Sequence, residues 1–350
     1  MSPGKAERAG FSRRVVEWQL VHGRHHLPWQ NTRDPYRVWL SEVMLQQTQV
    51  STVIDYFSRF VTRLPDVRAL AAAELDEIMG LWSGLGYYSR ARNLHRCATE
   101  VVRVWGGEFP RSATALESLP GIGRSTAAAI ASLCFSEPVA ILDANVRRVL
   151  TRVLGFDADL ALQANQHALW NAATQLLPGP DQAQLMPRYT QGMMDLGATV
   201  CLARQPVCAS CPVQSQCVAY REGATHRYPV RSRTLRRSAQ SLWLLWAQTP
   251  GDAVWLRKRP APGVWAGLHC LPWFESREAL AEQVPAQYRV ALEDQDPFKH
   301  VLTHKDLYLH TVRVQLPGTA MEQREGQWFD ADQWPRLGLP APVRRVLLQA

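Results

Sequence analysis

Four cysteines lie within 17 residues of one another and carry the strongest chemical signal in this sequence. They are spaced C-x6-C-x2-C-x5-C and comprise Cys201, Cys208, Cys211 and Cys217. Thiolates so close in sequence can converge on one centre, and both zinc and a [4Fe–4S] cluster accept four sulfur ligands. Two disulfides are a weaker alternative, because the chain lacks the N-terminal apolar stretch of a secretory signal. The spacing therefore predicts one metal centre in a loop over residues 201–217.

A glycine-rich turn separates two segments of helical pattern at about residues 112–135. The turn reads L-P-G-I-G over residues 119–123, with Gly121 and Gly123 as its glycines, and Ser125 follows in an alanine-rich run. Glycines let the backbone approach a phosphate closely, and the free N–H groups at the start of the second helix can bind an anion. A simple connection between two helices explains the segment equally well. Any nucleic-acid binding here is independent of base sequence, because it involves only the backbone.

Two carboxylates stand in segments that could perform acid–base chemistry. Asp143 lies twenty residues after Gly123 and directly before a helical run, so we expect it to cap that helix. A carboxylate beside a DNA-bound hairpin could also stabilise positive charge that develops on a sugar, and the two roles are compatible. Glu42 lies in a largely apolar helical stretch. From the residues alone, an exposed helix glutamate is the better interpretation of Glu42.

The elements that must position these residues change character near residue 238. Before it, apolar patterns of helical length are separated by glycine and proline breaks, and residues 36–61 contain neither glycine nor proline. The predicted helical segments are 67–80, 89–105, 112–118, 124–135, 145–154, 161–177 and 188–201. Short β-leaning runs follow at 241–247, 253–258 and 307–315. We expect a multi-domain chain with an all-helical domain (1–221), a basic interdomain linker (222–238) and a smaller α+β domain (239–350).

Composition and charge set the broad class of the protein. The 350 residues are 46% hydrophobic and 20% charged, which is typical of a globular chain of about two domains. No apolar run is long enough to span a bilayer, and we expect a cytoplasmic protein. The formal net charge of +8 suits a polyanionic partner. In the linker, a solvated segment is the simpler interpretation, and contact with phosphates is the functional one. It holds Arg227, Arg231, Arg233, Arg236 and Arg237 without an acidic residue between positions 226 and 237.

The order of these motifs resembles that of the endonuclease III superfamily of DNA glycosylases. A helix-hairpin-helix, a downstream aspartate and the cysteine loop follow one another in this order. Within the superfamily, W-L-S-E-V-M-L-Q-Q-T-Q-V (39–50) and G-L-G-Y-Y-S-R-A (84–91) are similar to the MutY adenine DNA glycosylases. The resemblance covers nearly the whole chain. It implies an all-α helix-hairpin-helix glycosylase domain with one [4Fe–4S] cluster on the four cysteines, followed by a MutT-like α+β domain.

The resemblance also implies a reaction. Such enzymes remove adenine mispaired with 8-oxoguanine or guanine from double-stranded DNA, after the base is flipped out of the helix. Glu42 would protonate the adenine at N7, Asp143 would stabilise the oxocarbenium-like sugar, and Asn145 would position Asp143. Glu42 must then stay protonated near neutral pH, and its apolar neighbours would raise its pKa by desolvation. We expect the enzyme to act as a monomer.

Further residues take roles by the same alignment. Leu27, Trp29 and Gln191 fall where the family lines its adenine pocket. Gln47 and Tyr87 match residues that wedge into the DNA around the orphaned base. Each of these residues alone is more typical of a core or a surface, and it is their agreement with one alignment that gives them weight.

The distribution of lysines bears on the mechanism. Members of the superfamily that also cut the strand have a lysine directly after the arginine of the hairpin, where it forms a Schiff base. Ser125 occupies this position, and the chain has no lysine from residue 6 to residue 257. The sequence therefore predicts a monofunctional glycosylase that leaves an intact abasic site.

The C-terminal segment resembles a MutT-like module without the glutamate cluster of a Nudix hydrolase, so pyrophosphate hydrolysis is not expected. In the family this domain senses 8-oxoguanine, commonly through a Phe-Ser-His turn. This chain departs from that pattern and offers two candidates. We favour Leu302-Thr303-His304, because Thr303 keeps the hydroxyl, over the alternative at residues 298–300.

Overall fold

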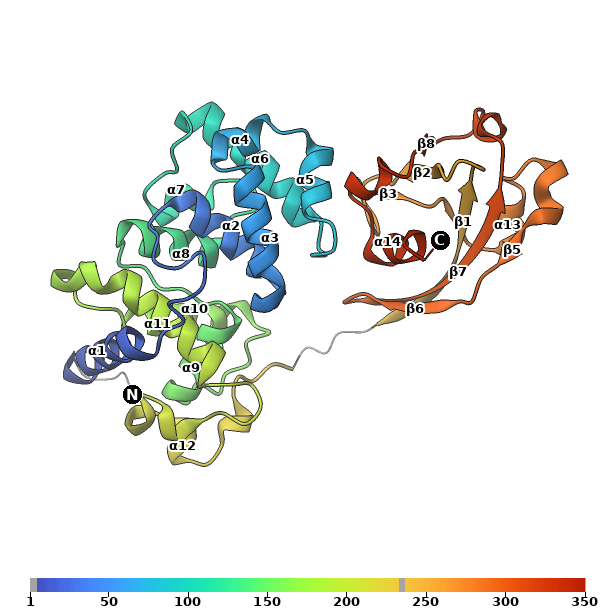
Figure 1. The fold of residues 1–350 in the computed structure, drawn as a ribbon. Coiled ribbons are helices and arrows are strands. Elements are labelled where there is room, and N and C mark those ends of the chain that lie inside the picture. Colours follow the sequence, from blue (N-terminus) through green and yellow to red (C-terminus); the bar gives the residue numbers. More distant parts are fainter. Residues whose placement is uncertain (1–4, 233–236, 350) are drawn as a thin grey trace. The chain divides into compact units, whose positions relative to one another are not determined.

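The computed structural model describes residues 5–232 and 237–349, and the chain forms two compact units. The first comprises Met1–Ala71 and Arg96–Arg233, and the second comprises Ala72–His95 and Thr234–Ala350. Figure 1 shows that the first is built from helices and that the C-terminal part of the second is built around a sheet. The expected fold class, helical followed by α+β, is confirmed. Arg233 and Arg236 of the predicted linker lie outside the described residues.

The first unit is a set of helices joined by short loops. Near its C-terminal end, the cysteine loop forms two short 3-10 turns, η2 (Cys208–Ser210) and η3 (Gln214–Gln216). Helix α6 (Ser89–Trp105) begins in the second unit and ends in the first. The remaining elements are α1 (Lys5–His22), α2 (Pro35–Leu45), α3 (Val50–Arg63), α4 (Val67–Ala72), α7 (Ala113–Glu117), α8 (Arg124–Phe135), α9 (Ala144–Leu154), α10 (Gln163–Thr174), η1 (Pro180–Leu185), α11 (Met186–Thr199), α12 (Val218–Arg221) and η4 (Thr225–Arg227).

The predicted helix at 67–80 and the stretch at 36–61, which lacks glycine and proline, are both interrupted. Residues 36–61 divide into α2 and α3, because the backbone leaves the helix at Gln46 and turns left-handed at Gln47, with φ of +57°. Residues 67–80 divide into α4 and α5 (Leu75–Leu81). Neither break contains a glycine or a proline, so the sequence pattern gave no signal for them.

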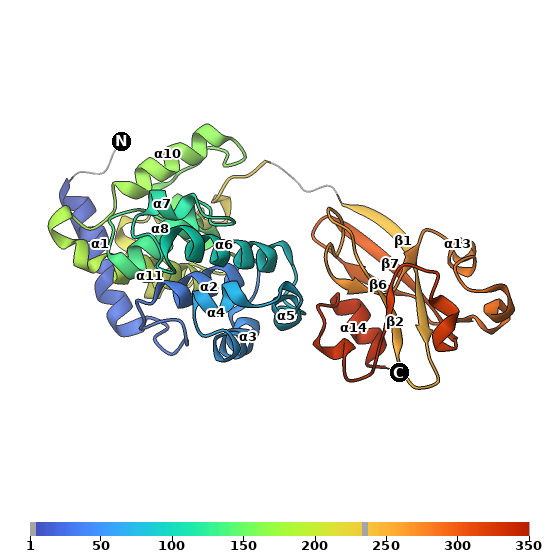
Figure 2. The same cartoon turned by 90° about the horizontal axis from the view of Figure 1, so that it is seen from above.

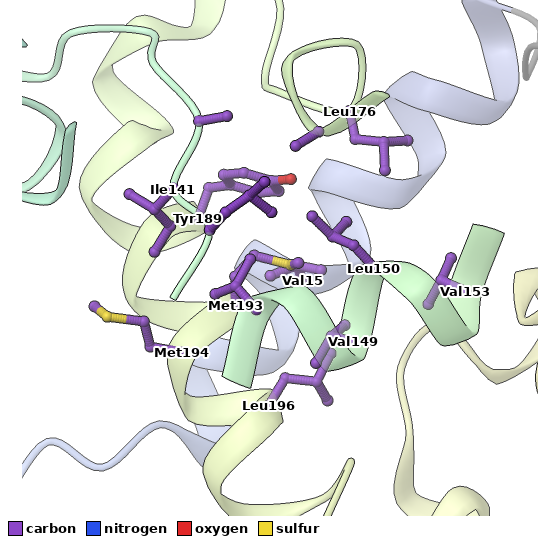
Figure 3. Close-up of a cluster of buried hydrophobic side chains, with 14 of the residues drawn as sticks. Val15, Ile141, Val149, Leu150, Val153, Leu176, Tyr189, Met193, Met194 and Leu196 are labelled. Atoms are coloured by element: carbon purple, nitrogen blue, oxygen red, sulfur yellow. The ribbon is translucent and has the colours of Figure 1, made fainter. Parts of the chain in front are cut away.

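A buried cluster of apolar side chains holds α9 and α11 in place. Figure 3 shows side chains of α1, α9 and α11 converging on one region, with Tyr189 and Met193 of α11 facing Leu150 of α9. Leu150 and Met193 are both 1% exposed. Burying side chains of this size contributes roughly 1.5–3 kcal/mol each. This packing fixes the start of α9, and therefore the residues that stand at its N-terminus.

The second unit contains a twisted sheet in which β1 and β7 form a long parallel pair. Their register runs from Ser238 opposite Lys305 to Gln248 opposite Gln315, and the strand order along the sheet is β3-β2-β1-β7-β5. The predicted runs at 241–247, 253–258 and 307–315 fall in β1, β2 and β7. The strands are β1 (Ser238–Gln248), β2 (Val254–Lys258), β3 (His269–Cys270), β4 (Trp273–Phe274), β5 (Glu293–Asp294), β6 (Phe298–Val301), β7 (Lys305–Gln315) and β8 (Gln327–Phe329).

Two helices flank this sheet, as the view from above shows (Figure 2): α13 (Arg277–Ala281) on one face and α14 (Ala341–Leu347) on the other. Short 3-10 turns complete the unit at η5 (Ala286–Ala291), η6 (Gly318–Met321) and η7 (Trp334–Arg336).

Segment 72–95 is joined to the C-terminal part of this unit by hydrogen bonds. The Ser83 and Tyr88 hydroxyls both donate to the Leu339 carbonyl, at 2.9 Å and 3.0 Å.

The start of the predicted linker is bound to the first unit. The Leu160 amide donates to the Val230 carbonyl at 3.1 Å, and the Ser232 amide donates to Asp159 at 3.1 Å. In the described part of the chain, no helix is long and apolar enough to cross a membrane.

Candidate functional site

Asp143 is the N-cap of α9, as the sequence predicted. Its Oδ1 accepts a hydrogen bond from the Val146 amide at 2.6 Å. Burial raises the pKa of Asp143, and the amides of Val146 and Asn145 and the nearby arginines Arg148 and Arg147 oppose this rise. The carboxylate is therefore held in a protein environment from which water is largely removed, and backbone donors at a helix N-terminus keep it in one orientation.

Glu42 lies on α2 between Ser41 and Val43, which are both buried. It is half-buried rather than exposed, contrary to the interpretation from the residues alone. Burial, chiefly, and the nearby Asp143 carboxylate together raise the pKa of Glu42 to about 7. A rise by desolvation is what the family resemblance implied for Glu42. The structure thus brings together two carboxyl groups that lie 101 residues apart in the chain (143 − 42).

Asn145 stands on the first turn of α9, where Arg148 holds its side chain. Arg148 Nη2 donates to Asn145 Oδ1 at 2.8 Å and to the Gly197 carbonyl at 2.7 Å, and Arg148 Nε donates to the Cys201 carbonyl at 2.8 Å. A Cβ on Gly197 would lie 2.6 Å from the Asn145 Cβ, so glycine is required for the close approach of α11 to α9. One guanidinium therefore joins the start of α9, α11 and the first cysteine. Sequence reasoning did not identify this role of Arg148.

The four cysteines line one cavity, together with apolar residues of α9 and α11. Arg152, which is 2% exposed, donates from Nη1 to Cys201 Sγ at 3.4 Å and to the Leu202 carbonyl at 2.6 Å. Burial, chiefly, and the neighbouring cysteines raise the pKa of the Cys211 thiol to about 12, although a backbone hydrogen bond from Val213 opposes the rise. Among the described residues, no three His, Cys, Asp or Glu side chains have the arrangement of a formed metal site. Four thiols around one largely apolar cavity are nevertheless a donor set that fits a metal cluster, whose positive charge would permit the thiols to ionise together.

The hairpin between α7 and α8 leaves its backbone accessible. Gly121 adopts φ of +79°, a conformation that favours glycine. Gly123 is the N-cap of α8, no side chain caps this end, and a Cβ at Gly123 would meet no atom within 4 Å. The Ser125 hydroxyl accepts a hydrogen bond from the Leu142 amide at 3.2 Å, next to Asp143. The hairpin is therefore tied to the segment that carries the aspartate.

Trp29 and Gln191 line a common cavity of about 340 Å³, whose walls come from the loop after α1, from α8 and from α11. Gln191 Nε2 donates to Asp195 Oδ1 at 2.9 Å, and Asp195 also forms an ion pair with Arg24 at 2.8 Å. Leu27 is buried, at 3% exposure, and is not among the residues that line this cavity. Sequence reasoning identified neither Arg24 nor Asp195.

Gln47 and Tyr87 are both exposed and both have left-handed backbones, with φ of +57° and +47°. Residues other than glycine rarely adopt this conformation, and it occurs preferentially at functional sites. Gln47 stands in the turn between α2 and α3, and Tyr87 stands two residues before the start of α6.

Thr303 and His304 form the turn between β6 and β7. With Tyr87, Trp265 and His300 they line a cavity of about 650 Å³ within the second unit. The Thr303 and Tyr87 hydroxyls lie 2.6 Å apart. The alternative triplet at residues 298–300 is part of strand β6, where Lys299 forms an ion pair with Asp306 at 2.7 Å.

Comparison with known proteins places this arrangement in a family. Residues 40–172 match the model of the HhH-GPD superfamily of base excision DNA repair proteins, and residues 242–349 match that of the NUDIX domain. The chain is 34% identical to an adenine DNA glycosylase of Buchnera aphidicola subsp. Acyrthosiphon pisum, covering 96% of each chain. The chain belongs to the adenine DNA glycosylase family.

Other DNA glycosylases are similar to part of the chain. An adenine DNA glycosylase of Mus musculus is 46% identical over 61% of this chain and 42% of its own length. A solved thermostable thymine-DNA glycosylase is 29% identical and superimposes with a TM-score of 0.55 over 62% of this chain and 98% of its own. As a member of the adenine DNA glycosylase family, the protein is a DNA N-glycosylase of base excision repair.

Proposed function

We propose that this glycosylase hydrolyses the N-glycosidic bond of adenine mispaired with 8-oxoguanine, or with guanine, and leaves the DNA strand uncut. The observation that carries the proposal is the pair of carboxyl groups, Glu42 and Asp143. Burial and Asp143 bring the pKa of Glu42 to about 7, so a large fraction of Glu42 is protonated at neutral pH. A general acid is most effective when its pKa lies near the working pH.

In the proposed reaction, Glu42 donates its proton to N7 of the flipped adenine. The bond between N9 and C1′ then breaks, and its electron pair leaves with the base. The sugar is left with oxocarbenium character, and the Asp143 carboxylate stabilises this positive charge. Asn145 and the Val146 amide hold Asp143 in place, and the cationic sugar offsets the cost of its burial. Water adds at C1′ and loses a proton to the Glu42 carboxylate, which places a hydroxyl on C1′ of the abasic sugar and returns Glu42 to its acid form.

We assign adenine binding to Leu27, Trp29 and Gln191. Trp29 and Gln191 support this assignment because they line one cavity large enough for a purine. Leu27 is a buried residue of the loop after α1 and would act by shaping that loop. Neither Glu42 nor Asp143 lines this cavity, but Val38, which stands one helical turn before Glu42 on α2, does.

DNA is contacted, in this proposal, by exposed turns of both units. Gln47 and Tyr87 wedge into the duplex around the orphaned base, which their outward left-handed turns favour. Gly121, Gly123 and Ser125 bind a phosphate through the uncapped start of α8, where helix N–H groups and the helix dipole favour an anion. Because these contacts are to the backbone, they position the enzyme without reading sequence.

Recognition of the base opposite adenine is assigned to Thr303 and His304. Both stand on an exposed turn that borders a cavity, and the Thr303 hydroxyl can donate or accept a hydrogen bond. 8-Oxoguanine differs from guanine by a C8 carbonyl and an N7 hydrogen. A hydroxyl at the end of a turn can meet either group.

We further propose one [4Fe–4S] cluster per chain, held by Cys201, Cys208, Cys211 and Cys217. The shared cavity, the apolar lining and the Arg152 contact to Cys201 support it. When bound, the cluster supplies a structural crosslink for the loop. No redox step is needed to break a glycosidic bond, and the chemistry belongs to the two carboxyl groups.

The absence of strand cleavage is proposed from the hairpin. Ser125 stands where a Schiff base would need an amine, and its hydroxyl is engaged with the Leu142 amide. No lysine occurs between residues 6 and 257 to replace it.

We also propose that the protein acts as a monomer on chromosomal DNA in the cytoplasm, with residues 222–238 as a basic connector and residues 239–350 as the domain that senses the opposite base.

The test uses duplexes with adenine opposite 8-oxoguanine, guanine or thymine, and reads base release as cleavage after alkali. We expect release opposite 8-oxoguanine and guanine and little opposite thymine. Asp143→Asn is the matched control, because it keeps the size of the side chain and should abolish release while binding of the duplex persists. No release from the 8-oxoguanine duplex by wild-type enzyme contradicts the proposal, and binding without release indicates a non-catalytic DNA-binding protein.

A further inference from the structure

A buried carboxylate fixes the polarity of the Gln191 amide. Asp195 on α11 is fully buried, at 0% exposure, and lies one helical turn after Gln191. Its Oδ1 accepts from Gln191 Nε2 at 2.9 Å and from Arg24 Nε at 2.8 Å, and its Oδ2 accepts from the Arg24 amide at 3.1 Å. A carboxylate paired with a guanidinium accepts hydrogen bonds and donates none. Only the NH2 group of Gln191 can therefore face Asp195.

The contact with Asp195 also decides which atom of the Gln191 amide remains for a ligand. In a free glutamine the amide can rotate by half a turn and exchange its donor and acceptor, and its orientation is set by the hydrogen bonds around it. Rotation here would press Gln191 Oε1 against the Asp195 carboxylate in a buried place, where unpaired oxygens are costly. The Gln191 oxygen is thus left as the acceptor, on a side chain that lines the cavity of about 340 Å³ beside Trp29.

We propose that Asp195 is a positioning residue that makes the base cavity selective for a 6-aminopurine. An acceptor at Gln191 matches the exocyclic N–H of adenine and opposes the carbonyl of a 6-oxopurine such as hypoxanthine. This inference rests on the proposed function, because it takes the purine in the cavity to be the excised base. It explains how the Gln191 amide, held in one orientation by Asp195, can discriminate between an amino group and a carbonyl at C6 of the base.

The alternative role of Asp195 is structural. Its ion pair with Arg24 ties the loop after α1 to α11, and any buried ion pair broken on one side destabilises a protein. The two roles predict different substrate profiles. A structural role changes the rate on every base by the same factor, whereas an orienting role changes the ratio between bases that differ only at C6.

The experiment measures single-turnover base release from duplexes with 8-oxoguanine opposite adenine, hypoxanthine or unsubstituted purine. Purine has hydrogen at C6 and keeps N7, so it reports the chemistry of Glu42 without the C6 contact. The variant is Asp195→Asn. With its oxygen in place of Oδ2, accepting from the Arg24 amide, its NH2 takes the place of Oδ1 and donates to Gln191, so that Gln191 turns its own NH2 toward the cavity. We expect the adenine-to-hypoxanthine rate ratio to fall by about tenfold or more, the range for one well-placed base contact.

Gln191→Leu provides the matched control, because it removes the amide at nearly constant size. It should lower the adenine-to-purine ratio, and adding Asp195→Asn to it should change the ratio no further. If Asp195→Asn does not fold, Asp195→Ser is measured on the same three duplexes. Equal rate loss on all three bases overturns the inference and assigns Asp195 to structure. Failure of wild-type enzyme to release adenine opposite 8-oxoguanine would instead refute the proposed function, and the two failures are distinct.

Discussion

The hydroxyl oxygens of Tyr87 and Thr303 lie 2.6 Å apart, although 216 residues separate them in the sequence. Tyr87 adopts a left-handed backbone, and Thr303 stands in the turn between β6 and β7. Thr303, which we assign to recognition of the opposite base, and Tyr87, which we assign to the DNA wedge, therefore form one hydrogen-bonded pair. If the pair acts as a unit, recognition of 8-oxoguanine depends on both residues.

Removing either hydroxyl should therefore weaken the preference for 8-oxoguanine over guanine. We expect Tyr87→Phe and Thr303→Val each to lower the ratio of kcat/KM values on the two mismatches by roughly fivefold, the worth of about 1 kcal/mol for one hydrogen bond. The double variant should lose no more than either single one, because both remove the same bond. Thr303→Ser keeps the hydroxyl and should retain the preference. Additive losses in the double variant would show that the two hydroxyls act separately.

The rate of base release should depend on pH through Glu42. Because the pKa of Glu42 is raised to about 7 and the acid form is the reactive one, the single-turnover rate should fall about tenfold per pH unit above 7. Asp143 must be ionised, so a second decline appears at acid pH, displaced upward because burial raises the pKa of Asp143. The two groups interact, so the observed values belong to the pair. A rate that stays constant from pH 6 to pH 9 would remove Glu42 from the role of general acid.

The same shift predicts a pH-dependent cost in stability. A carboxyl group whose pKa is higher in the folded protein than in the unfolded chain favours folding below its unfolded value of 4.5 and loses that contribution as pH rises to about 7. Glu42→Gln does not titrate, so it should exceed the wild type in free energy of unfolding by an amount that grows to about 3 kcal/mol above pH 7. Denaturant unfolding at pH 5 and pH 8 measures this. An equal difference at both pH values would contradict it.

How far the sequence predicted this site depends on the kind of signal each residue leaves. The N-cap at Asp143 follows from an aspartate before a helical run, and β1, β2 and β7 follow from their apolar runs; both expectations are confirmed. The break at Gln47 contains no glycine or proline, and glutamine has no local preference for the left-handed backbone that it adopts there, so the sequence pattern does not indicate the break. Asp195 is invisible in the sequence, since a buried aspartate resembles an exposed one until its partner Arg24 is known. Long-range polar contacts are thus what sequence patterns miss.

Strand cleavage is a further property that the structure allows to be tested. Because no lysine stands in the hairpin, borohydride should trap no covalent complex with DNA, and the abasic product should stay uncut until alkali is added. Ser125→Lys should introduce trapping, since it places an amine directly beside the Asp143 segment. It should also slow base release, because the bond from the Leu142 amide to the Ser125 hydroxyl, worth about 1 kcal/mol, is lost. Trapping by the wild type would refute the monofunctional mechanism.

Replacement of one loop cysteine should separate structure from chemistry. We expect Cys208→Ser to lower the melting temperature and weaken duplex binding, because Arg148 and Arg152 both bond to the segment that begins at Cys201 and connect it to α9. Glu42 lies on α2, outside that loop, so the single-turnover rate of the enzyme that does bind should remain close to that of the wild type. Ser210→Ala, an exposed change in the same loop, is the control and should leave both properties unchanged. Normal duplex binding by protein without a cluster would show that DNA binding does not require the metal. A lower rate of base release with normal duplex binding would show that the loop affects the carboxyl pair through Arg148.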